Sequence, residues 1–381
     1  MREVFIVSDN VVSPLGNTSV DNFINLKNNV SGIRLQDNMA LSSQPVYASI
    51  INDSALDVPG SNGHAYTKFE KLLIASVDDA LKLSGIKAGD EKTVLIISST
   101  KGNISLLESE EISKATQQRI SLSHSADLVA EHFGFVNKPI VVSHACISGL
   151  VAIITGMRLI QSGKYDTAVV TGADVITKFI LSGFQSFQAV SSEPCKPFDE
   201  TRNGITLGEG AATVILSANK PANGAIKVTG GAISNDANHI SGPSRTGEEL
   251  YQAIASAIKE SGLSKDDIDF ISAHGTATSY NDEMEAKAIN LAGMQDIPLN
   301  SLKGFYGHTL GAAGLIETVI SLHSLKENVV LPTPGYNKLG TSKPVNIFTA
   351  LKEGVFNTCL KTASGFGGCN AAIVLQKTKH F

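Results

Sequence analysis

The stretch "VVSHACISGLVAI" (residues 141–153) changes from strand-like to helix-like sequence at a single cysteine, Cys146. Apolar β-branched residues precede the cysteine. Residues 148–162 after it are apolar on nearly all sides, which predicts a buried helix. Ala145 and Gly149 are small enough to let a ligand or another helix come close. The stretch therefore predicts a strand–helix unit of an α/β protein, with Cys146 at the joint.

A later stretch of the chain is similar to this one. Residues 142–164, "VSHACISGLVAIITGMRLIQSGK", and 304–326, "GFYGHTLGAAGLIETVISLHSLK", both have a turn, one reactive residue and then a helix rich in small residues. His308 in the second stretch falls where Cys146 does in the first. The similarity predicts two similar halves that bring two helix N-termini to one place. Chance similarity between two α/β units is the alternative.

The composition of the whole chain fits a large, well-packed α/β protein. The 381 residues are 42% hydrophobic and 18% charged, and the net charge is −5 without a long run of either sign. This balance argues against binding to nucleic acid or to an anionic membrane surface. No apolar stretch is long enough to cross a bilayer, and the N-terminus lacks a secretory apolar region. The four cysteines form no CxxC pair, so we expect a reduced, cytoplasmic protein.

Strand-like and helical segments alternate along the chain. Apolar residues at helical spacing predict helices over 66–84 and 247–261, which end at Gly85 and Gly262. Runs such as "KTVLIISST", "DTAVVTGAD" and "NAAIVLQK" predict strands.

Cys146 would lie at the N-terminus of the helix that follows it. The positive end of a helix dipole favours the thiolate, and the free backbone N–H groups there can bind an oxyanion. These features suit a nucleophile. The alternative is a buried structural cysteine, which is the more common situation for any one cysteine.

The segment "SAHGTATSYNDEMEA" (272–286) contains a histidine directly after a predicted strand. His274 would therefore point toward the usual ligand crevice of an α/β sheet. Thr276 and Thr278 present two hydroxyls on the same side of an extended segment, where they could hydrogen-bond a polar tether. The alternatives are a structural histidine, and a turn capped by the hydroxyls before a helix that starts near Asp282.

The segment "NSLKGFYGHTLGAAGLIETVI" (300–320) contains a second histidine and a possible ion pair. We expect His308 to open a helix, whose dipole would favour the neutral imidazole, a donor for a developing oxyanion. Glu317, on the same predicted helix, could pair with Lys303. The alternative is a helix-packing motif of small residues with a lysine that faces solvent.

The segment "ASGFGGCNAAIVL" (363–375) predicts a glycine-rich turn between two strands, which would leave the N–H of Phe366 free to be aimed at a ligand. An ordinary hairpin is the alternative. Cys146, His274 and His308 lack the spacing of a zinc site, and the chain has no phosphate-binding loop. We therefore expect neither a metal nor a nucleotide cofactor.

Together, these four segments resemble the β-ketoacyl-acyl carrier protein synthases, the elongating condensing enzymes of the thiolase fold. The family motifs stand here, in family order, as "ACISG", "HGTAT", "KGFYGHTLGAAGLIE" and "GFGGCN", joined by "VVSPLG" and "KPFDETRNGITLGEGAA". The resemblance covers essentially the whole chain. It implies an α/β, five-layer αβαβα thiolase-like fold with two pseudo-repeated halves. Residues 1–220 would carry the nucleophile, and residues 221–381 the two histidines.

The resemblance also implies roles for the reactive residues. Cys146 would take the growing acyl chain as a thioester. His274 and His308 would assist malonyl decarboxylation and stabilise the enolate. Lys303 and Glu317 would form the charged pair that supports this site.

The same resemblance implies how the substrates are held. The backbone N–H groups of Cys146 and Phe366 would form the oxyanion hole, with the Phe366 ring as a gatekeeper. Thr276 and Thr278 would bind the phosphopantetheine arm of an acyl carrier protein, the only carrier of the substrates, with no other cofactor. The resemblance further implies a homodimer, or a heterodimer with a homologous synthase subunit.

Two residues beside the nucleophile depart from the family pattern. Ile147 is bulky and could narrow the acyl pocket. His144 is expected to be either a packed core imidazole or a residue that perturbs the thiol. Cys369 lies outside the thiolase pattern and is interpreted as structural. Two alternative functions stay open: a malonyl-carrier decarboxylase that primes chains, and a partner subunit that binds carrier protein without turnover.

Overall fold

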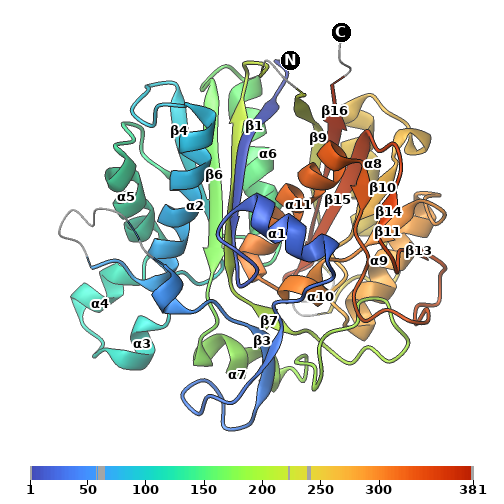
Figure 1. Ribbon diagram of the computed structural model, residues 1–381, viewed down its shortest axis with the longest axis horizontal. Coiled ribbons are helices and arrows are strands. Elements are labelled where there is room, and N and C mark those ends of the chain that lie inside the picture. Colours follow the sequence, from blue (N-terminus) through green and yellow to red (C-terminus); the bar gives the residue numbers. More distant parts are fainter. Residues whose placement is uncertain (1, 57, 59–64, 222–223, 238–241, 379–381) are drawn as a thin grey trace.

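The computed structural model describes residues 2–56, 58, 65–221, 224–237 and 242–378 (Figure 1). Within these residues, the largest sheet has eleven strands, and the strands from each half of the chain stay together. In spatial order the strands are β13 (Asn346–Ile347), β11 (Pro298–Asn300), β10 (Phe270–Ser272), β15 (Thr358–Gly365), β16 (Cys369–Lys377), β9 (Ile226–Asn235), β1 (Phe5–Val12), β8 (Gly210–Ser217), β6 (Thr167–Asp174), β4 (Thr93–Ser98) and β5 (Ile140–Val142).

The two halves of the sheet are joined by a short antiparallel pairing between β1 and β9, in which Phe5 lies opposite Lys227. In the first half, β4 runs parallel to both β5 and β6. In the second half, β10 runs parallel to both β11 and β15. Each half thus has a parallel core with antiparallel strands toward the junction, and the carboxyl ends of its parallel strands form one edge.

Helices cover the strands in layers. The principal helices are α2 (Lys68–Ser84), α5 (Leu122–Phe133), α6 (Ser148–Gln161), α8 (Glu248–Ser261), α9 (Ser279–Leu291) and α11 (Ala313–Glu327). Helix α2 packs on β1, β6 and β8, and α8 packs on β9 and β16. Helices α6 and α11 contact each other and strands of both halves, so they form the middle layer. The predicted five-layer αβαβα fold is confirmed.

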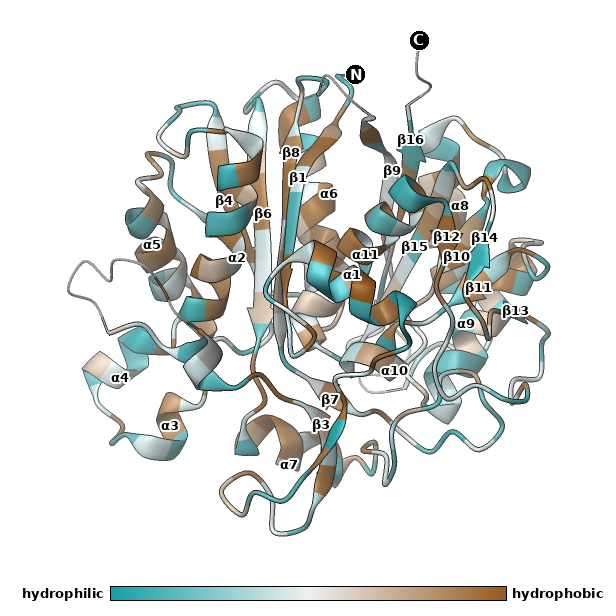
Figure 2. Cartoon of the chain, viewed as in Figure 1, coloured by the Kyte–Doolittle hydropathy of each residue, from teal (hydrophilic) through white to brown (hydrophobic). Residues whose placement is uncertain are grey.

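The middle layer explains why its two helices are apolar on all sides. In Figure 2, α6 and α11 are mostly hydrophobic, whereas α2 and α8 also carry hydrophilic residues. Every residue of α11 from Ala313 to Leu322 is buried. A helix between the two halves of the sheet has no face toward water, so burial rather than amphipathicity decides its sequence.

Helices α6 and α11 approach each other at glycines. A Cβ on Gly149 would lie 2.8 Å from the backbone nitrogen of Leu315. A Cβ on Gly314 would lie 2.9 Å from the backbone nitrogen of Leu150. Only residues without a Cβ permit this contact, which brings the N-terminal turns of the two helices together, as the internal similarity predicted.

The outer helices begin and end with the expected signals. The helix predicted over 66–84 is α2, where Thr67 and Glu70 form a capping box and Gly85 ends the helix with a left-handed backbone. The helix predicted over 247–261 is α8, which also ends at a left-handed glycine, Gly262. Both predictions are confirmed.

Smaller elements gather at the end of the molecule opposite to the two termini (Figure 1). There, β3 pairs with β2 and with β7, and α7 lies beside them. The remaining elements are β2 (Arg34–Gln36), β3 (Val46–Ser49), β7 (Leu207–Gly208), β12 (Val329–Val330), β14 (Lys352–Glu353), α1 (Ser19–Lys27), α3 (Leu106–Ser109), α4 (Lys114–Arg119), α7 (Lys178–Ser186), α10 (Lys303–Tyr306) and short 3₁₀ helices at Asp53–Ala55, Lys265–Asp267 and Leu310–Ala312.

Candidate active site

Cys146 lies in a sharp turn between β5 and α6. Ala145, the residue before it, has a left-handed backbone with φ of 45°, which is unfavourable for a residue with a side chain. The Ser148 hydroxyl braces this turn: it accepts a hydrogen bond from the His144 N–H at 2.7 Å and donates one to the Ala145 carbonyl at 2.6 Å. The turn therefore holds the thiol at the start of the buried helix.

The Cys146 thiol is buried, with 8% of the residue exposed. Burial and, to a smaller extent, the neighbouring Cys369 raise the pKa of Cys146 to about 12, although Lys303 and the Phe366 backbone N–H act to lower it. The helix dipole, which the sequence predicts to favour the thiolate, therefore does not keep Cys146 deprotonated in the resting protein. Removal of the thiol from water outweighs the favourable charges. A base must take the proton before the sulfur can act.

The glycine-rich turn between β15 and β16 faces this thiol. Its Phe366 N–H lowers the pKa of Cys146 through a backbone hydrogen bond. Gly368 has φ of 74°, and a Cβ there would lie 1.8 Å from the Asp236 carbonyl oxygen, so only glycine fits. The Phe366 ring is 40% exposed and lies 5.7 Å, centroid to centroid, from the rings of both Phe184 and Phe187. An aromatic cluster thus stands beside the thiol.

His274 follows the carboxyl end of β10, as predicted, and is buried. The carboxylate of Glu285 holds its turn by accepting the N–H groups of His274 and Gly275 at 2.9 and 2.8 Å. The His274 ring lies edge to face with the ring of His308, with centroids 5.2 Å apart. Two histidines that are 34 positions apart in the chain thus form one buried pair.

Lys303 connects this pair to Glu317. Its ammonium donates to Glu317 Oε1 at 2.6 Å and to the His274 carbonyl at 2.7 Å, and it lies 3.3 Å from His274 Nδ1. An ammonium can only donate, so Nδ1 must accept and the ring proton must sit on Nε2. The side chain is 1% exposed, so the interpretation as a solvent-facing lysine is wrong.

His308 is held by its backbone against strand β7, between Thr206 and Gly208. Its N–H donates to the Thr206 carbonyl at 2.6 Å, and its carbonyl accepts from the Gly208 N–H at 3.1 Å. Its Nδ1 is buried without a hydrogen-bond partner among the described residues. The expected helix does not open at His308. Because Leu310 has a left-handed backbone and begins a 3₁₀ turn, α11 starts only at Ala313.

Both histidines are held in the neutral form. Burial lowers the pKa of His274 and of His308 well below the usual value, and the positive charges of Lys303 and Lys361 lower both further. The predicted neutral imidazoles agree with this direction. The cause differs from the predicted helix dipole, because desolvation and two ammonium groups act instead.

Thr276 and Thr278 lie on the turn after His274. Their hydroxyl oxygens are 3.0 Å apart, and the Thr278 hydroxyl accepts from the Asn281 N–H as the N-cap of α9. Ala277 lies between them and has φ of 63°, so it is a second residue other than glycine with a left-handed backbone. The capping interpretation is therefore confirmed for Thr278. Thr276 is buried and Thr278 is half-buried.

Three further buried charges lie in this region, and none is among the residues that the sequence motifs pointed to. Lys361 on β15 lies 2.7 Å from Glu317 Oε2. Glu285 holds the turn at His274. Asp174 accepts from the Ser99 hydroxyl and from the Gly311 N–H, both at 2.7 Å, and so ties the loop after β4 to the turn before α11. For Asp174 and Lys361, the available signal was a charged residue inside a run of small or apolar residues. Glu285 lies among other charged residues and had no such signal.

The residues that depart from the family pattern have different surroundings. His144 is exposed, so the packed core imidazole is wrong. Ile147 is fully buried at the N-cap of α6, packed within the middle-layer core. Cys369 is buried, and its thiol donates to the Phe366 carbonyl at 3.3 Å. All four cysteines are free thiols.

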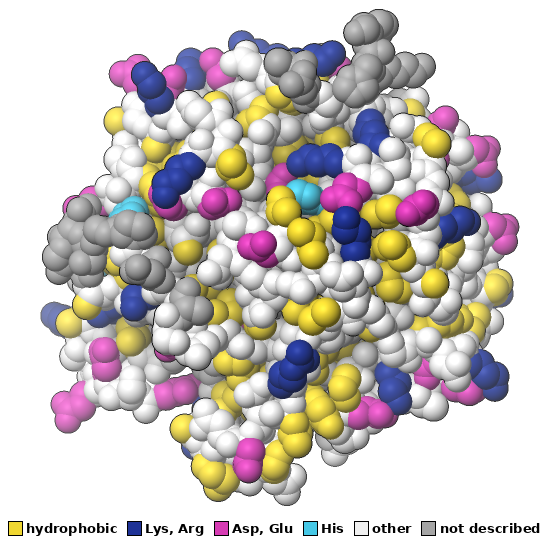
Figure 3. All heavy atoms as spheres, viewed as in Figure 1, with side chains coloured by type: hydrophobic (Ala, Val, Ile, Leu, Met, Phe, Trp, Pro, Cys, Tyr) yellow, Lys and Arg dark blue, Asp and Glu magenta, His cyan; other side chains and the backbone are white. Residues whose placement is uncertain are grey.

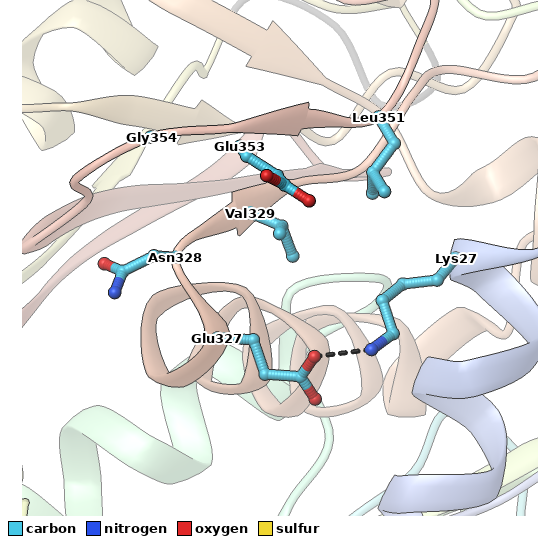
Figure 4. Close-up of a pocket in the computed structure, with 7 residues that line it drawn as sticks. All are labelled: Lys27, Glu327, Asn328, Val329, Leu351, Glu353 and Gly354. Atoms are coloured by element: carbon cyan, nitrogen blue, oxygen red, sulfur yellow. Dashed lines mark hydrogen bonds and ion pairs between the residues drawn. The ribbon is translucent and has the colours of Figure 1, made fainter.

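The described ranges contain neither a metal site nor a membrane-spanning helix. No three His, Cys, Asp or Glu side chains there gather in a way that could hold a metal ion. No helix of that part of the chain combines the length and apolarity needed to span a bilayer. A surface hollow of about 430 Å³ opens where α1 meets the end of α11. The Lys27–Glu327 ion pair forms part of its lining (Figure 4). None of the candidate site residues lines this hollow.

The sequence of this chain matches known protein families and individual relatives. The β-ketoacyl synthase N-terminal domain matches residues 1–222, and the β-ketoacyl synthase C-terminal domain matches residues 226–337. A putative mitochondrial 3-oxoacyl-[acyl-carrier-protein] synthase of Schizosaccharomyces pombe is 27% identical over 428 aligned positions, which cover 99% of each protein. A tetracenomycin polyketide synthase ketoacyl synthase alpha subunit of Streptomyces glaucescens is 32% identical, over 63% of this chain and 60% of that protein.

A solved structure agrees with these matches. The ketosynthase of Xenorhabdus doucetiae, in complex with its chain length factor, superposes with a TM-score of 0.86 at 25% identity, over 99% of this chain and 98% of that chain. Both domain matches, the full-length relative and this superposition point to the same group of condensing enzymes. The chain therefore belongs to the β-ketoacyl synthase family.

Proposed function

We propose that this protein catalyses the decarboxylative condensation of an acyl chain, held on Cys146, with malonyl-acyl carrier protein. The product would be a 3-oxoacyl-carrier protein in fatty-acid or polyketide synthesis. The observation that carries the proposal is the buried pair of neutral imidazoles, backed by the Lys303–Glu317 ion pair and placed beside the thiol turn. The relatives reported above include a 3-oxoacyl-carrier synthase and a polyketide ketosynthase.

The first step loads the acyl chain. Cys146 Sγ attacks the thioester carbonyl of the acyl carrier, the bond from that carbon to the carrier sulfur breaks, and the carrier leaves as a thiol. A neutral imidazole can accept the thiol proton of Cys146, whose pKa burial raises to about 12. The N–H groups of Cys146 and Phe366 would stabilise the oxyanion that forms.

The second step forms the carbon–carbon bond. The carboxyl group of the malonyl carrier leaves as carbon dioxide, and its electron pair passes into an enolate. The Nε2–H of His274 and a ring N–H of His308 would stabilise the negative oxygen in a site closed to water. The enolate carbon then attacks the acyl carbon on Cys146, and the Cys146 thiolate leaves and regains a proton.

We further propose how the carrier is bound. The hydroxyls of Thr276 and Thr278 would hold the phosphopantetheine arm, and no other cofactor enters this scheme. The face shown in Figure 3 carries lysine and arginine side chains interspersed with aspartate and glutamate. Such a mixed surface offers only local positive charge for an acidic carrier protein.

We also propose an assembly of two synthase chains, either identical or homologous. Strand β5 ends the eleven-stranded sheet, and its residues Ile140 to Val142 are half-buried apolar side chains. An edge strand of this kind is a ready surface for pairing with another chain. The Xenorhabdus doucetiae relative was solved with its chain length factor. The division of the chain into halves 1–220 and 221–381 stays a prediction. The cytoplasmic location, which was expected from the free thiols, also stays a prediction.

An acyl-loading assay followed by a condensation assay tests the function. Incubation with an acyl-carrier protein should add the acyl mass to Cys146, and malonyl carrier should then yield a 3-oxoacyl product and carbon dioxide. Cys146→Ala should abolish both the adduct and the product. Carbon dioxide without an acyl adduct would favour a priming decarboxylase. Carrier binding with neither signal would indicate a non-catalytic partner subunit and overturn the proposal.

A further inference from the structure

A second lysine is buried next to the candidate active site. Lys361 lies in the middle of β15 with none of its surface exposed. Its ammonium donates to the carbonyls of Ser272 and Ala273, each at 3.1 Å, and to the Thr362 carbonyl at 2.8 Å. Since Ser272 and Ala273 end the strand that carries His274, Lys361 contacts the base of the histidine turn.

Lys361 also shares Glu317 with Lys303. Lys303 lies 2.6 Å from Glu317 Oε1, and Lys361 lies 2.7 Å from Glu317 Oε2. The ammonium of Lys361 is the ion-pair partner of Oε2. Burial lowers the pKa of Lys361, and this contact acts against burial to raise it. Glu317 is therefore clamped between two ammonium groups. Its orientation, and through it that of Lys303, depends on both.

A second carboxylate balances the second lysine. Glu285 is fully buried and accepts the Thr362 hydroxyl at 2.7 Å as well as the N–H groups of the histidine turn. Its charge also acts favourably on Lys361. Two lysines and two glutamates thus form one buried set around His274. Charges buried in this way are retained only when each has partners.

We propose that Lys361 is a positioning residue for the decarboxylation step, which it supports by clamping Glu317 and the end of β10. This inference rests on the proposed function. Lys361 touches neither the thiol turn nor the Phe366 turn through any of its hydrogen bonds given above. Its loss should therefore affect the histidine half of the reaction and spare acyl loading on Cys146.

The charge of Lys361 gives the proposal a pH signature. Positive charge on Lys361 lowers the pKa of both His274 and His308. The charged or titratable groups that surround Lys361 are Lys303, Glu317, Glu285, His274, His308 and Cys359. Without Lys361, the imidazoles would bind a proton at higher pH. A protonated His274 could no longer accept from Lys303 at Nδ1.

Lys361→Met tests the proposal against Cys359→Ala. Cys359 lies two residues earlier on β15 and is equally buried, so its variant removes packing without removing charge. We expect Lys361→Met to load acyl chains within about twofold of wild type, yet to lose about tenfold or more in malonyl decarboxylation. Its acid limb in the pH–rate profile should move to higher pH. Cys359→Ala should keep the wild-type limb.

The outcomes distinguish a failure of the proposed condensing activity from a failure of the role proposed for Lys361. A wild-type protein that neither loads nor decarboxylates would contradict the proposed function itself. An active wild type with an unchanged pH profile in Lys361→Met, or with loading and decarboxylation reduced equally, would overturn the role of Lys361. Lys361→Gln, which keeps N–H donors for the backbone carbonyls, is measured alongside. If the methionine variant does not fold, the same pH comparison is decided on the glutamine variant.

Discussion

The ring of His274 meets the ring of His308 edge to face, at 82° between the planes and 5.2 Å between the centroids. Contact this close means that one substrate oxygen could receive a hydrogen bond from each ring. The two histidines should therefore act on the same developing charge. Acyl loading needs only one imidazole, as the base that accepts the Cys146 proton, so it should depend less on the pair.

His308→Asn tests this division of labour. We expect malonyl decarboxylation to fall by about 10²-fold, because one donor to the developing oxyanion is lost. Acyl loading of Cys146 should stay within about tenfold of wild type, measured as the rate of mass gain on the intact protein. A variant that loses loading and decarboxylation in equal proportion would contradict the assignment.

The neutral histidines also predict how stability depends on pH. Burial holds the pKa of His274 and of His308 well below the usual value, whereas in the unfolded chain each binds a proton near pH 6.5. Below pH 6.5 the unfolded state then binds more protons, so the free energy of unfolding falls as the pH falls. The loss should reach about 1 kcal/mol or more per histidine.

Urea unfolding between pH 7 and pH 5 measures this effect. The control is the double variant His274→Gln with His308→Gln, which has neither imidazole and should lose less stability over the same range. Other buried groups, such as Asp282, whose pKa burial raises to about 6, act equally in both proteins. Parallel stability curves for the two proteins would rule the explanation out.

The crossing of α6 and α11 predicts a strong effect of one methyl group. In Gly149→Ala, the added Cβ would lie 2.8 Å from the Leu315 backbone nitrogen, so the helices must separate. We expect a loss of about 1–3 kcal/mol in the free energy of unfolding. Gly183→Ala on α7 is the matched control, because a Cβ there meets nothing within 4 Å. The control should be neutral, or more stable by up to about 1 kcal/mol.

Ile147 is where acyl chain length is most simply tested. Its side chain is fully buried directly after the nucleophile, so Ile147→Ala should open space beside the thiol. We expect longer acyl chains to load faster relative to short ones, at a cost of about 2–4 kcal/mol in stability. Ile160→Ala, at the other end of α6 and equally buried, should cost similar stability without changing the preference. An identical change of preference in both variants would argue against a pocket at Ile147.

Much of the site could be predicted because its residues occupy turns with distinctive sequence. His274 and Phe366 each lie between a strand and a glycine, and Cys146 lies between a strand and a helix that begins with Ser148 and Gly149. The possible ion pair of Lys303 with Glu317, which the family resemblance also implied, is confirmed, because Nζ and Oε1 lie 2.6 Å apart. Local sequence fixes such turns because few residues tolerate their backbone.

The rest could not be predicted because it depends on which face of an element is buried. Lys361 in "CLKTASG" is a charged residue in a strand, which local sequence would normally place toward water. Its partners Glu317 and Glu285 come from two other helices, and only the packed layers bring them to β15. The raised pKa of the Cys146 thiol could not be predicted for the same reason, since burial is a property of the whole fold.

Three turns of the site carry a left-handed backbone at residues other than glycine: Ala145, Ala277 and Leu310. Each costs about 1–2 kcal/mol relative to an ordinary conformation. Glycine at Ala145 or Ala277 would relieve that cost, but it would also loosen the loop that presents the thiol or the two threonines. Such a substitution would then raise thermal stability and lower the catalytic rate. At Leu310, glycine would remove a buried core side chain and so would not stabilise the protein. Directed evolution for thermostability should accumulate glycine at Ala145 and Ala277, keep Leu310, and lose activity as it does so.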